Sequence, residues 1–522
     1  MAPSYIVFFG TFVHHSRANS KALAIQQGAL WVSTTDGRIK GTDWTIVTEG
    51  DLRALLREKG WVPDTASHYR RGTRVKIVQA REDQNEFFFP GFIDTHMHAP
   101  QYPNTGLFGD STLLDWLKKY TFPMEASFGS PFPNIPSPRA YRVYNQVVSR
   151  TLASGTTFAS YFATIHVPAT NLLATLCQKR GQRALIGRVC MDHSLDPKDT
   201  YKDASTEESI EFTKDVISYI QSIDPDGTVV KPIVTPRFAL SCTSEAMESL
   251  GALAASYDPP LHIQTHIAEN KQEIQDVQDL YKQSYAEVYA TRGLLTPRTI
   301  LAHGVHLTSD EHDLIHKQGS SISHCPASNS ALGSGICPVR TLLDKGITVG
   351  LGTDVSGGYS PSILETVRQA CLVSRLVRHL DTGNKSNEDD GDKMVLSVEE
   401  ALYLATRGGA KSVRMEDDIG GFDIGMFWDA QLIHLGRFSP AQSQDDGESR
   451  VDVFGWEDWT EKIHKWVWNG SDRNVKGVWV GGRLVYGRSE VECESRRGWL
   501  SWALGAGVVG VGAVFAFRRM KL

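Results

Sequence analysis

Eight short apolar runs, each with the composition of a β-strand, follow one another between residues 87 and 354. They are FFFPGFIDTH, TTFASYF, ALIGRVCMD, VVKPIVTPRF, LHIQTHIAE, TILAHGVHL, SISHCPAS and ITVGLGTD. The segments that separate such runs mostly have helical periodicity, as in TEESIEFTKDVISYIQSI and SILETVRQACLVSRLV. Alternating strands and helices are typical of a parallel sheet, and eight such units predict an α/β fold of the (β/α)8 TIM barrel type.

Strand-rich sequence lies on both sides of this region. IVFFGTFVHH and ALWVSTTDGRIKG come before it, and GMFWDAQLIHLG and KGVWVGGRLVYG follow the helical segment SVEEALYLATRGGAKSV. Their alternation and turn residues indicate strands, and we expect the second group to complete the sheet begun by the first. We therefore predict a composite β-sandwich formed by residues 1–88 and 421–490, with the barrel at residues 89–420.

Composition narrows the class of partner. The chain has 522 residues, 41% hydrophobic and 22% charged, and its net charge of −6 provides no basic stripe for phosphates. This argues against nucleic acid and favours a small-molecule substrate. The seven cysteines are scattered without a CxxC pair, so neither a disulfide framework nor a thiolate zinc site is expected, and the catalytic part should be cytosolic.

Polar residues stand at the carboxyl ends of the predicted strands, where TIM barrels assemble their active sites. These residues are His96, His98, Arg237, His266, His303, His324 and Asp354. His96 and His98 are two positions apart, so on a strand their side chains point to the same face. Three histidines with one aspartate suit zinc or another borderline divalent cation, and an open position for water would make the site catalytic.

The motif THIAEN places Glu269 three residues after His266. At a strand-to-helix turn, a carboxylate in this position can reach water at the metal without being a ligand, as a general base must. The alternative is that Glu269 only caps the following helix, where a negative charge is favourable.

The motifs PGFIDTHMH, THIAEN, LAHGVHL, SHCPASN and LGTDVSGG, in this order, resemble the amidohydrolase superfamily over residues 85–425. Within it, HMHAPQYPNTG, TPRFALSC and SHCPASNSALGSG are similar to the guanine deaminases of animals and fungi. The resemblance implies the composite β-sandwich and the hydrolytic deamination of guanine to xanthine and ammonia, a step of purine catabolism. It also suggests a homodimer.

The same resemblance assigns roles to individual residues. It implies one zinc ion per chain on His96, His98, His266 and Asp354. It makes Glu269 the proton shuttle, His303 the residue that polarises water or substrate, and Asp354 a catalytic residue that orients the water. The guanine pocket would be formed by Gln101 and Arg237 at the polar edges of the base, Phe238 on its plane, and His266.

Three alternatives stay open. The substrate could be another purine, a pyrimidine, a triazine or a pterin, because barrel loops change specificity without changing the fold. A binuclear amidase would need a carboxylated lysine at the end of the fourth strand, but Lys231 starts that strand. An inactive scaffold is the third alternative, although such relatives usually lose ligands.

Residues 499–517, WLSWALGAGVVGVGAVFAF, carry no charge and are flanked by arginines on both sides. As a helix they would be about 28 Å long, close to the roughly 30 Å of a bilayer core. Ala503 and Gly507 have the small-xxx-small spacing found in membrane helices. We predict a transmembrane tail anchor that holds the catalytic part on an intracellular membrane. A disordered or core-packed tail is the alternative.

Overall fold

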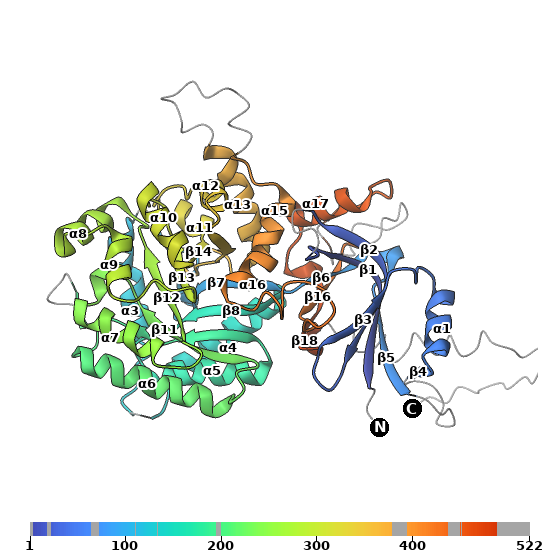
Figure 1. Cartoon of the computed structure of the whole chain (residues 1–522), viewed down its shortest axis with the longest axis horizontal. Coiled ribbons are helices and arrows are strands. Elements are labelled where there is room, and N and C mark those ends of the chain that lie inside the picture. Colours follow the sequence, from blue (N-terminus) through green and yellow to red (C-terminus); the bar gives the residue numbers. More distant parts are fainter. Residues whose placement is uncertain are drawn as a thin grey trace, which may run out of the picture.

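The computed structural model describes residues 4–17, 22–63, 73–109, 111–132, 134–194, 200–377, 394–436, 449 and 451–487. The described residues form two units that lie side by side (Figure 1). One is a barrel of parallel strands surrounded by helices, and the other is a mixed β-sheet built from segments near both ends of the chain.

Eight strands follow one another around the barrel in the described part of the chain, and all their pairings are parallel. They are β7 (Phe92–His98), β8 (Thr156–Phe162), β9 (Arg183–Gly187), β11 (Val230–Pro236), β12 (His262–Ile267), β13 (Thr299–His303), β14 (Ser321–His324) and β15 (Thr348–Leu351). The short strand β10 (Val189–Cys190) pairs with β11. The backbone N–H of Asp354 donates a hydrogen bond of 2.9 Å to the carbonyl of His96, which joins the last strand to the first.

The predicted TIM barrel is therefore confirmed, and each apolar run contributes a strand to it. The run FFFPGFIDTH differs from the expectation of one strand, because it divides at Gly91. β6 (Glu86–Pro90) belongs to the mixed sheet, whereas β7 belongs to the barrel. A Cβ atom at Gly91 would lie 2.1 Å from Oγ1 of Thr157, so only glycine lets the chain pass this close to β8.

Helices surround the strands, as the crossover connections of a parallel sheet require. They are α4 (Pro138–Ala153), α5 (Val167–Arg180), α6 (Thr206–Ile223), α7 (Ser244–Ala255), α8 (Lys271–Tyr281), α9 (Tyr285–Thr291), α10 (Ser309–Gln318), α11 (Pro326–Ala331), α12 (Val339–Asp344), α13 (Ile363–Val377), α15 (Val398–Tyr403) and α16 (Gly409–Ser412). The π-helical turn η5 (Leu404–Gly408) joins the last two, and η4 (Ala239–Ser241) follows β11. The predicted helical segments TEESIEFTKDVISYIQSI and SILETVRQACLVSRLV correspond to α6 and α13.

The connection from β7 to β8 is long and contains the elements that cover the carboxyl ends of the strands. These are η2 (Ala99–Asn104), α2 (Leu113–Trp116), the π-helical turn η3 (Leu117–Thr121) and α3 (Phe122–Ala126). The hydroxyl of Thr112 caps α2 by accepting a hydrogen bond from the Asp115 N–H, which starts this covering segment at a defined residue.

The mixed sheet has the order β18-β17-β16-β6-β1-β2-β3, with β5 paired to β1 and β4 paired to β5. Its strands are β1 (Tyr5–His14), β2 (Ala24–Ser33), β3 (Ile39–Asp43), β4 (Trp61–Pro63), β5 (Thr73–Gln79), β6, β16 (Ala430–His434), β17 (Val475–Val480) and β18 (Arg483–Gly487). Helices α1 (Glu49–Glu58) and α17 (Trp459–Asn469) and the turns η1 (Glu82–Gln84) and η6 (Asp472–Asn474) accompany them. The composite sheet of N- and C-terminal segments is thus confirmed, while the predicted limits at 88 and 420 stay predictions.

Aromatic packing holds the mixed sheet together. Phe8, Phe88 and Trp428 are fully buried, and the ring of Phe8 lies 4.2 Å from that of Trp428. Because Phe8 and Phe88 come from the N-terminal part and Trp428 from the C-terminal part, this cluster joins the two halves of the unit.

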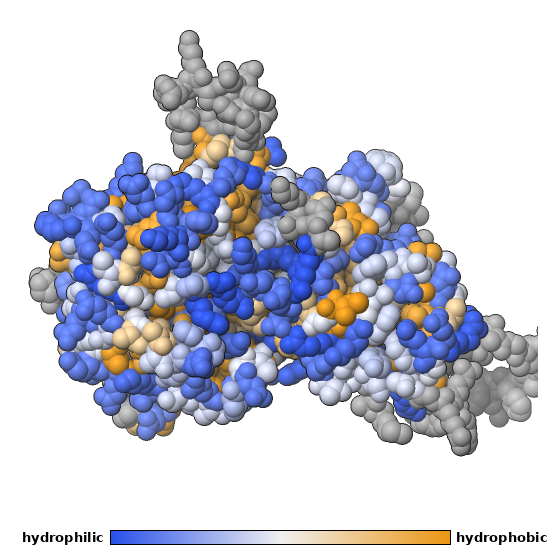
Figure 2. Space-filling model, viewed as in Figure 1, coloured by the Kyte–Doolittle hydropathy of each residue, from blue (hydrophilic) through white to orange (hydrophobic). Residues whose placement is uncertain are grey.

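The face seen in Figure 2 is largely hydrophilic, and its hydrophobic residues occur in small groups. Among the described residues, none of the helices combines the length and the apolar character needed to cross a bilayer. The predicted anchor at residues 499–517 lies outside the described residues, so it stays a prediction.

Candidate active site

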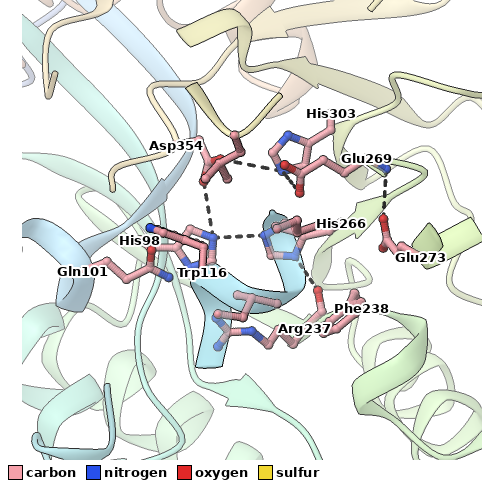
Figure 3. Close-up of a pocket in the computed structure, with 13 residues that line it drawn as sticks. His98, Gln101, Trp116, Arg237, Phe238, His266, Glu269, Glu273, His303 and Asp354 are labelled. Atoms are coloured by element: carbon pink, nitrogen blue, oxygen red, sulfur yellow. Dashed lines mark hydrogen bonds and ion pairs between the residues drawn. The ribbon is translucent and has the colours of Figure 1, made fainter. Parts of the chain in front are cut away.

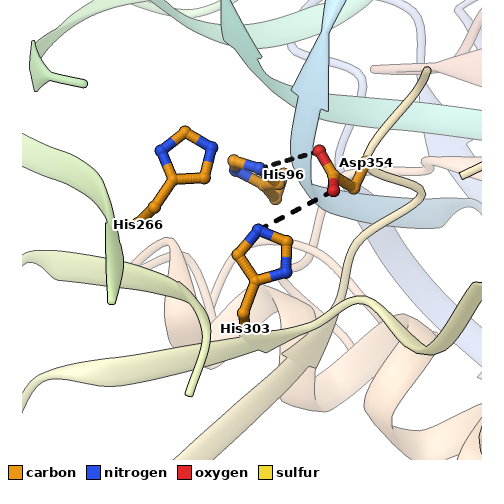
Figure 4. Close-up of side chains that lie close together, drawn as sticks. All are labelled: His96, His266, His303 and Asp354. Atoms are coloured by element: carbon orange, nitrogen blue, oxygen red, sulfur yellow. Dashed lines mark ion pairs between the residues drawn. The ribbon is translucent and has the colours of Figure 1, made fainter. Parts of the chain in front are cut away.

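Four side chains meet at the carboxyl end of the barrel, three from the ends of different strands and one, Asp354, from the segment after β15 (Figure 4). One ligand atom each of His96, His266, His303 and Asp354 lies within 4.8 Å of the others. Nε2 of His96 is 3.1 Å from Oδ1 of Asp354, and Nε2 of His303 is 3.7 Å from Oδ2 of the same carboxylate. Imidazole nitrogens and a carboxylate at this spacing can hold a divalent cation.

His98 also faces this group, although it is outside the set of four. Its Nε2 lies 3.0 Å from Nε2 of His266 and 3.5 Å from Oδ1 of Asp354. The structure therefore brings together all four predicted ligands, and it adds His303 as a fifth candidate ligand close to them.

Hydrogen bonds made by Nδ1 of His266 and Nδ1 of His303 determine that Nε2 of each ring points into the group. Nδ1 of His266 donates to the backbone carbonyl of Arg237 at 2.5 Å, and Nδ1 of His303 bonds Oδ1 of Asn329 at 2.9 Å. Each contact turns Nε2 of its ring toward the other side chains, which is how proteins orient histidine ligands. Asn329 lies in the motif SHCPASN, but its spacing gave no indication of this role.

Burial and neighbouring charges set the protonation of the group. Burial lowers the pKa of His96, and it lowers the pKa values of His98 and His266 well below the usual range. Burial alone would also lower the pKa of His303, but the carboxylates of Glu269 and Asp354 raise it overall. Burial would raise the pKa of Asp354, and the adjacent imidazoles lower it instead. Neutral imidazoles and an ionised carboxylate are the forms that bind metal.

Glu269 lies beside the group and reaches toward it. Its Oε2 is 3.3 Å from Nε2 of His303, and its Oε1 accepts a hydrogen bond of 2.9 Å from the hydroxyl of Ser334. Burial raises the pKa of Glu269 to about 7. A buried carboxyl with such a pKa can both accept and return a proton near neutral pH.

The helix that follows is capped by a different glutamate. Glu273 accepts hydrogen bonds from the backbone N–H groups of Glu269 and Asn270, and it forms a capping box with Asn270 at the start of α8. The capping alternative considered for Glu269 thus applies to Glu273, which leaves the Glu269 carboxylate directed at His303.

A pocket opens above these side chains (Figure 3). The four predicted substrate residues line it, namely Gln101, Arg237, Phe238 and His266, and so does Glu269. Its apolar wall was not predicted and consists of Leu113, Trp116, Leu117 and Leu332. Three of these come from the connection after β7, whose short helices gave no periodic signal in the sequence.

A buried carboxylate that sequence analysis missed lies behind the pocket. Glu125 accepts hydrogen bonds from Nη1 of Arg237 at 2.7 Å, from Nη2 of Arg237 at 3.1 Å, and from Nε2 of Gln101 at 2.8 Å. All three side chains are at most 2% exposed. Glu125 follows the apolar and basic segment WLKKYTFPM, where nothing marks one glutamate as buried.

Two residues considered from the sequence lie elsewhere. His324 lines a separate cavity with Val339 of α12 and Val373 of α13, so its side chain faces the helices outside the barrel. Lys231 is placed near the charges of Asp418 and Arg183, and burial lowers its pKa. Neither residue joins the group at the carboxyl ends of the strands.

Comparison with known proteins gives a consistent result. The amidohydrolase family matches residues 87–485. A probable guanine deaminase of Schizosaccharomyces pombe is 46% identical over 465 residues, covering 88% of this chain and 83% of its own. The guanine deaminase of Homo sapiens is 43% identical, covering 93% of this chain and 97% of its own.

Among solved structures, guanine deaminase from C. acetobutylicum with bound guanine in the active site superposes with a TM-score of 0.74 at 31% identity. The match covers 92% of this chain and 100% of that chain. The resemblance predicted from the motifs is thereby confirmed, and the chain belongs to the amidohydrolase family, in the group of the guanine deaminases.

Proposed function

We propose that the protein is a guanine deaminase, which hydrolyses guanine to xanthine and ammonia. The observation that carries this proposal is the position of Glu269 beside a buried histidine–aspartate group, directly below a pocket lined by Gln101, Arg237 and Phe238. The S. pombe and human relatives bear the name of this activity, and the C. acetobutylicum neighbour holds guanine in its active site.

The donor set fits one zinc ion. Nε2 of His96 is buried 3.1 Å from Oδ1 of Asp354, and Nε2 of His98 and Nε2 of His266 approach each other at 3.0 Å. A shared cation would satisfy these nitrogens, and with Asp354 they supply three imidazoles and one carboxylate. When bound there, zinc supplies a Lewis acid that lowers the pKa of a coordinated water to about 7.

Residues of the chain carry out the proton transfers. Glu269 removes a proton from the attacking water and delivers it to a ring nitrogen of guanine, while Asp354 orients that water. The hydroxyl oxygen adds to C2. Glu269 or His303 then takes the remaining proton of this hydroxyl and gives it to the amine, so that the C2–N bond breaks, ammonia leaves, and the C2 carbonyl of xanthine forms. The contact of 3.3 Å between these two side chains allows either to be the donor.

The pocket supports a planar, polar base. Phe238 offers an apolar face for stacking, Arg237 a donor for a carbonyl oxygen, and Gln101 an amide. The covering residues Leu113, Trp116 and Leu117 exclude water from the ring once it is bound.

Ammonia release from a panel of purines, pyrimidines, triazines and pterins tests the substrate directly. Guanine should give the highest kcat/KM, and a clear preference for another base would contradict the proposal. Metal analysis separates the remaining alternatives: one zinc per chain supports this mechanism, two ions support a binuclear amidase, and none supports an inactive scaffold. The position of Lys231 beside Arg183, away from the candidate ligands, favours one ion.

We also propose that the enzyme is a homodimer, and that residues 499–517 anchor its cytosolic catalytic part to an intracellular membrane. The support for the anchor is the uncharged sequence of this segment. Membranes should retain the full-length chain after carbonate extraction and release a variant that ends at Arg497. Equal recovery of both proteins in the soluble fraction would contradict the anchor, and light scattering of the shorter variant tests the dimer.

A further inference from the structure

We propose that Glu125 is a positioning residue that makes the pocket selective for the lactam edge of guanine. This inference rests on the proposed function, because it concerns how the same pocket distinguishes one purine from another. Its basis is that a single carboxylate holds both side chains that we expect at the polar edge of the base.

The first step concerns the spacing of Gln101 and Arg237. Nε2 of Gln101 and Nη2 of Arg237 donate to the same oxygen, Oε1 of Glu125, at 2.8 and 3.1 Å. Nη1 of Arg237 donates to the other oxygen at 2.7 Å. The amide belongs to η2, after β7, and the guanidinium belongs to the residue that follows β11, so one group keeps side chains from two separate segments next to each other.

The second step concerns the orientation of the Gln101 amide. A carboxylate that pairs with arginine only accepts hydrogen bonds, so the NH2 end of the amide must face Glu125. The oxygen end then accepts from the backbone N–H of Ser356 at 3.3 Å. If the amide were flipped, its oxygen would face the carboxylate oxygen of Glu125, and its NH2 group would face the backbone N–H of Ser356. Glu125 and Ser356 thus set which end of the amide is the acceptor.

The third step relates this arrangement to the substrate. Guanine carries a hydrogen-bond acceptor at O6 beside a donor at N1, whereas 2,6-diaminopurine carries a donor at C6 beside an acceptor at N1. Arg237, which only donates, matches O6, and the oxygen of Gln101 matches the N1 proton. With 2,6-diaminopurine, the donor of Arg237 would face the C6 amino group and the acceptor of Gln101 would face the bare N1. Buried polar groups would then stay unpaired, which strongly weakens the binding of such an analogue.

Burial makes this pattern rigid. Glu125 is fully buried, and Phe122, from the same short helix α3, places its ring 5.0 Å from the guanidinium carbon of Arg237. The segment that covers the pocket is therefore attached to the substrate residues by both a charge pair and a ring contact. No solvent is needed to complete the pairing of Glu125, since Arg237 and Gln101 supply three donors.

The test compares selectivity, which a loss of stability alone would not change. We would measure KM for guanine and the inhibition constant of 2,6-diaminopurine as a competitor, in the wild type and in Glu125→Gln. The ratio of inhibition constant to KM should fall at least about tenfold in Glu125→Gln, while the zinc content stays at the wild-type level. Glu125→Asp keeps the charge but has a shorter side chain. Its ratio of inhibition constant to KM should therefore lie between that of the wild type and that of Glu125→Gln.

Asp429→Asn is the matched control. Asp429 forms a similar buried pair with Arg183, at 2.6 and 3.2 Å, but Arg183 starts β9 and so lies at the end of the barrel opposite the pocket. This variant should lose stability and keep the wild-type ratio.

An unchanged ratio in Glu125→Gln, or an equal fall in Asp429→Asn, would overturn the inference. If Glu125→Gln does not fold, Glu125→Asp decides: a ratio lowered at least about threefold supports the inference, and an unchanged ratio overturns it. A wild-type protein that releases no ammonia from guanine would instead overturn the proposed function, and the inference with it.

Discussion

The hydroxyl of Ser334 donates a hydrogen bond of 2.9 Å to Oε1 of Glu269, so the two oxygens of this carboxylate have different partners. The other oxygen faces Nε2 of His303 at 3.3 Å. A carboxylate restrained in this way has one oxygen directed at the reacting group, which is what a proton shuttle requires.

Removing this restraint should slow the reaction without affecting the metal. In Ser334→Ala, Glu269 keeps its charge but loses a hydrogen bond to that charge, which contributes about 1.5–3 kcal/mol, so kcat should fall roughly ten- to a hundredfold. Steady-state ammonia release with metal analysis measures both effects. Ser330→Ala, at an exposed position of α11, should match the wild type. A normal kcat in Ser334→Ala would show that the hydroxyl does not position Glu269.

The proton shuttle itself should be separable from the metal ligands. Glu269→Gln keeps the shape of the side chain but cannot carry the proton, so turnover should fall roughly 10²–10⁴-fold while zinc is retained. His96→Ala and Asp354→Ala should lose zinc as well as activity. Glu311→Gln alters a buried helix-capping glutamate of α10 outside the pocket and is the control. Near-normal turnover in Glu269→Gln would refute the assignment.

The five candidate ligands call for a second comparison. His303 faces Glu269, whereas His98 faces His266, so we expect His98 to bind the metal and His303 to act on protons. His98→Asn should be purified without zinc, and His303→Asn should keep zinc but lose most of its activity. His324→Asn, buried outside the group, should keep zinc. Zinc loss in His303→Asn with retention in His98→Asn would reverse the two roles.

Acid should destabilise the fold through His262, which is 6% exposed at the start of β12. Burial, with the charges of Arg298 and Lys231, lowers its pKa to about 3 from 6.5. Because the unfolded chain binds this proton below pH 6.5 and the folded chain does not until about pH 3, the contribution to stability is complete above pH 6.5 and is lost as the pH falls. At pH 5 the loss should be about 2 kcal/mol.

His262→Gln removes this titration, so the difference between urea unfolding free energies at pH 7.5 and pH 5 should become smaller. His316→Gln, at an exposed position of α10, should leave the difference unchanged. An identical pH dependence in His262→Gln and the wild type would exclude His262 as a source of acid sensitivity.

Local pattern accounts for much of what could be predicted. Buried parallel strands need continuous apolar runs, and the active side of a barrel lies at their carboxyl ends, so residues such as His96, His266 and Asp354 could be found by position alone. The sequence motifs in addition indicated the amidohydrolase superfamily. Strand position alone does not determine side-chain direction, and His324 illustrates this, because adjacent residues of a strand point to opposite faces.

The sequence by itself determined the barrel, the composite sheet and the candidate metal ligands, because these depend on periodicity and on residues at strand ends. Only the tertiary structure decided two partners of the site: Glu125 behind Arg237, and Ser334 on Glu269. Both contacts join segments far apart in the chain, and a glutamate or serine has no local pattern that distinguishes a buried, paired side chain from a solvated one. Their burial and partners follow from packing of the whole barrel.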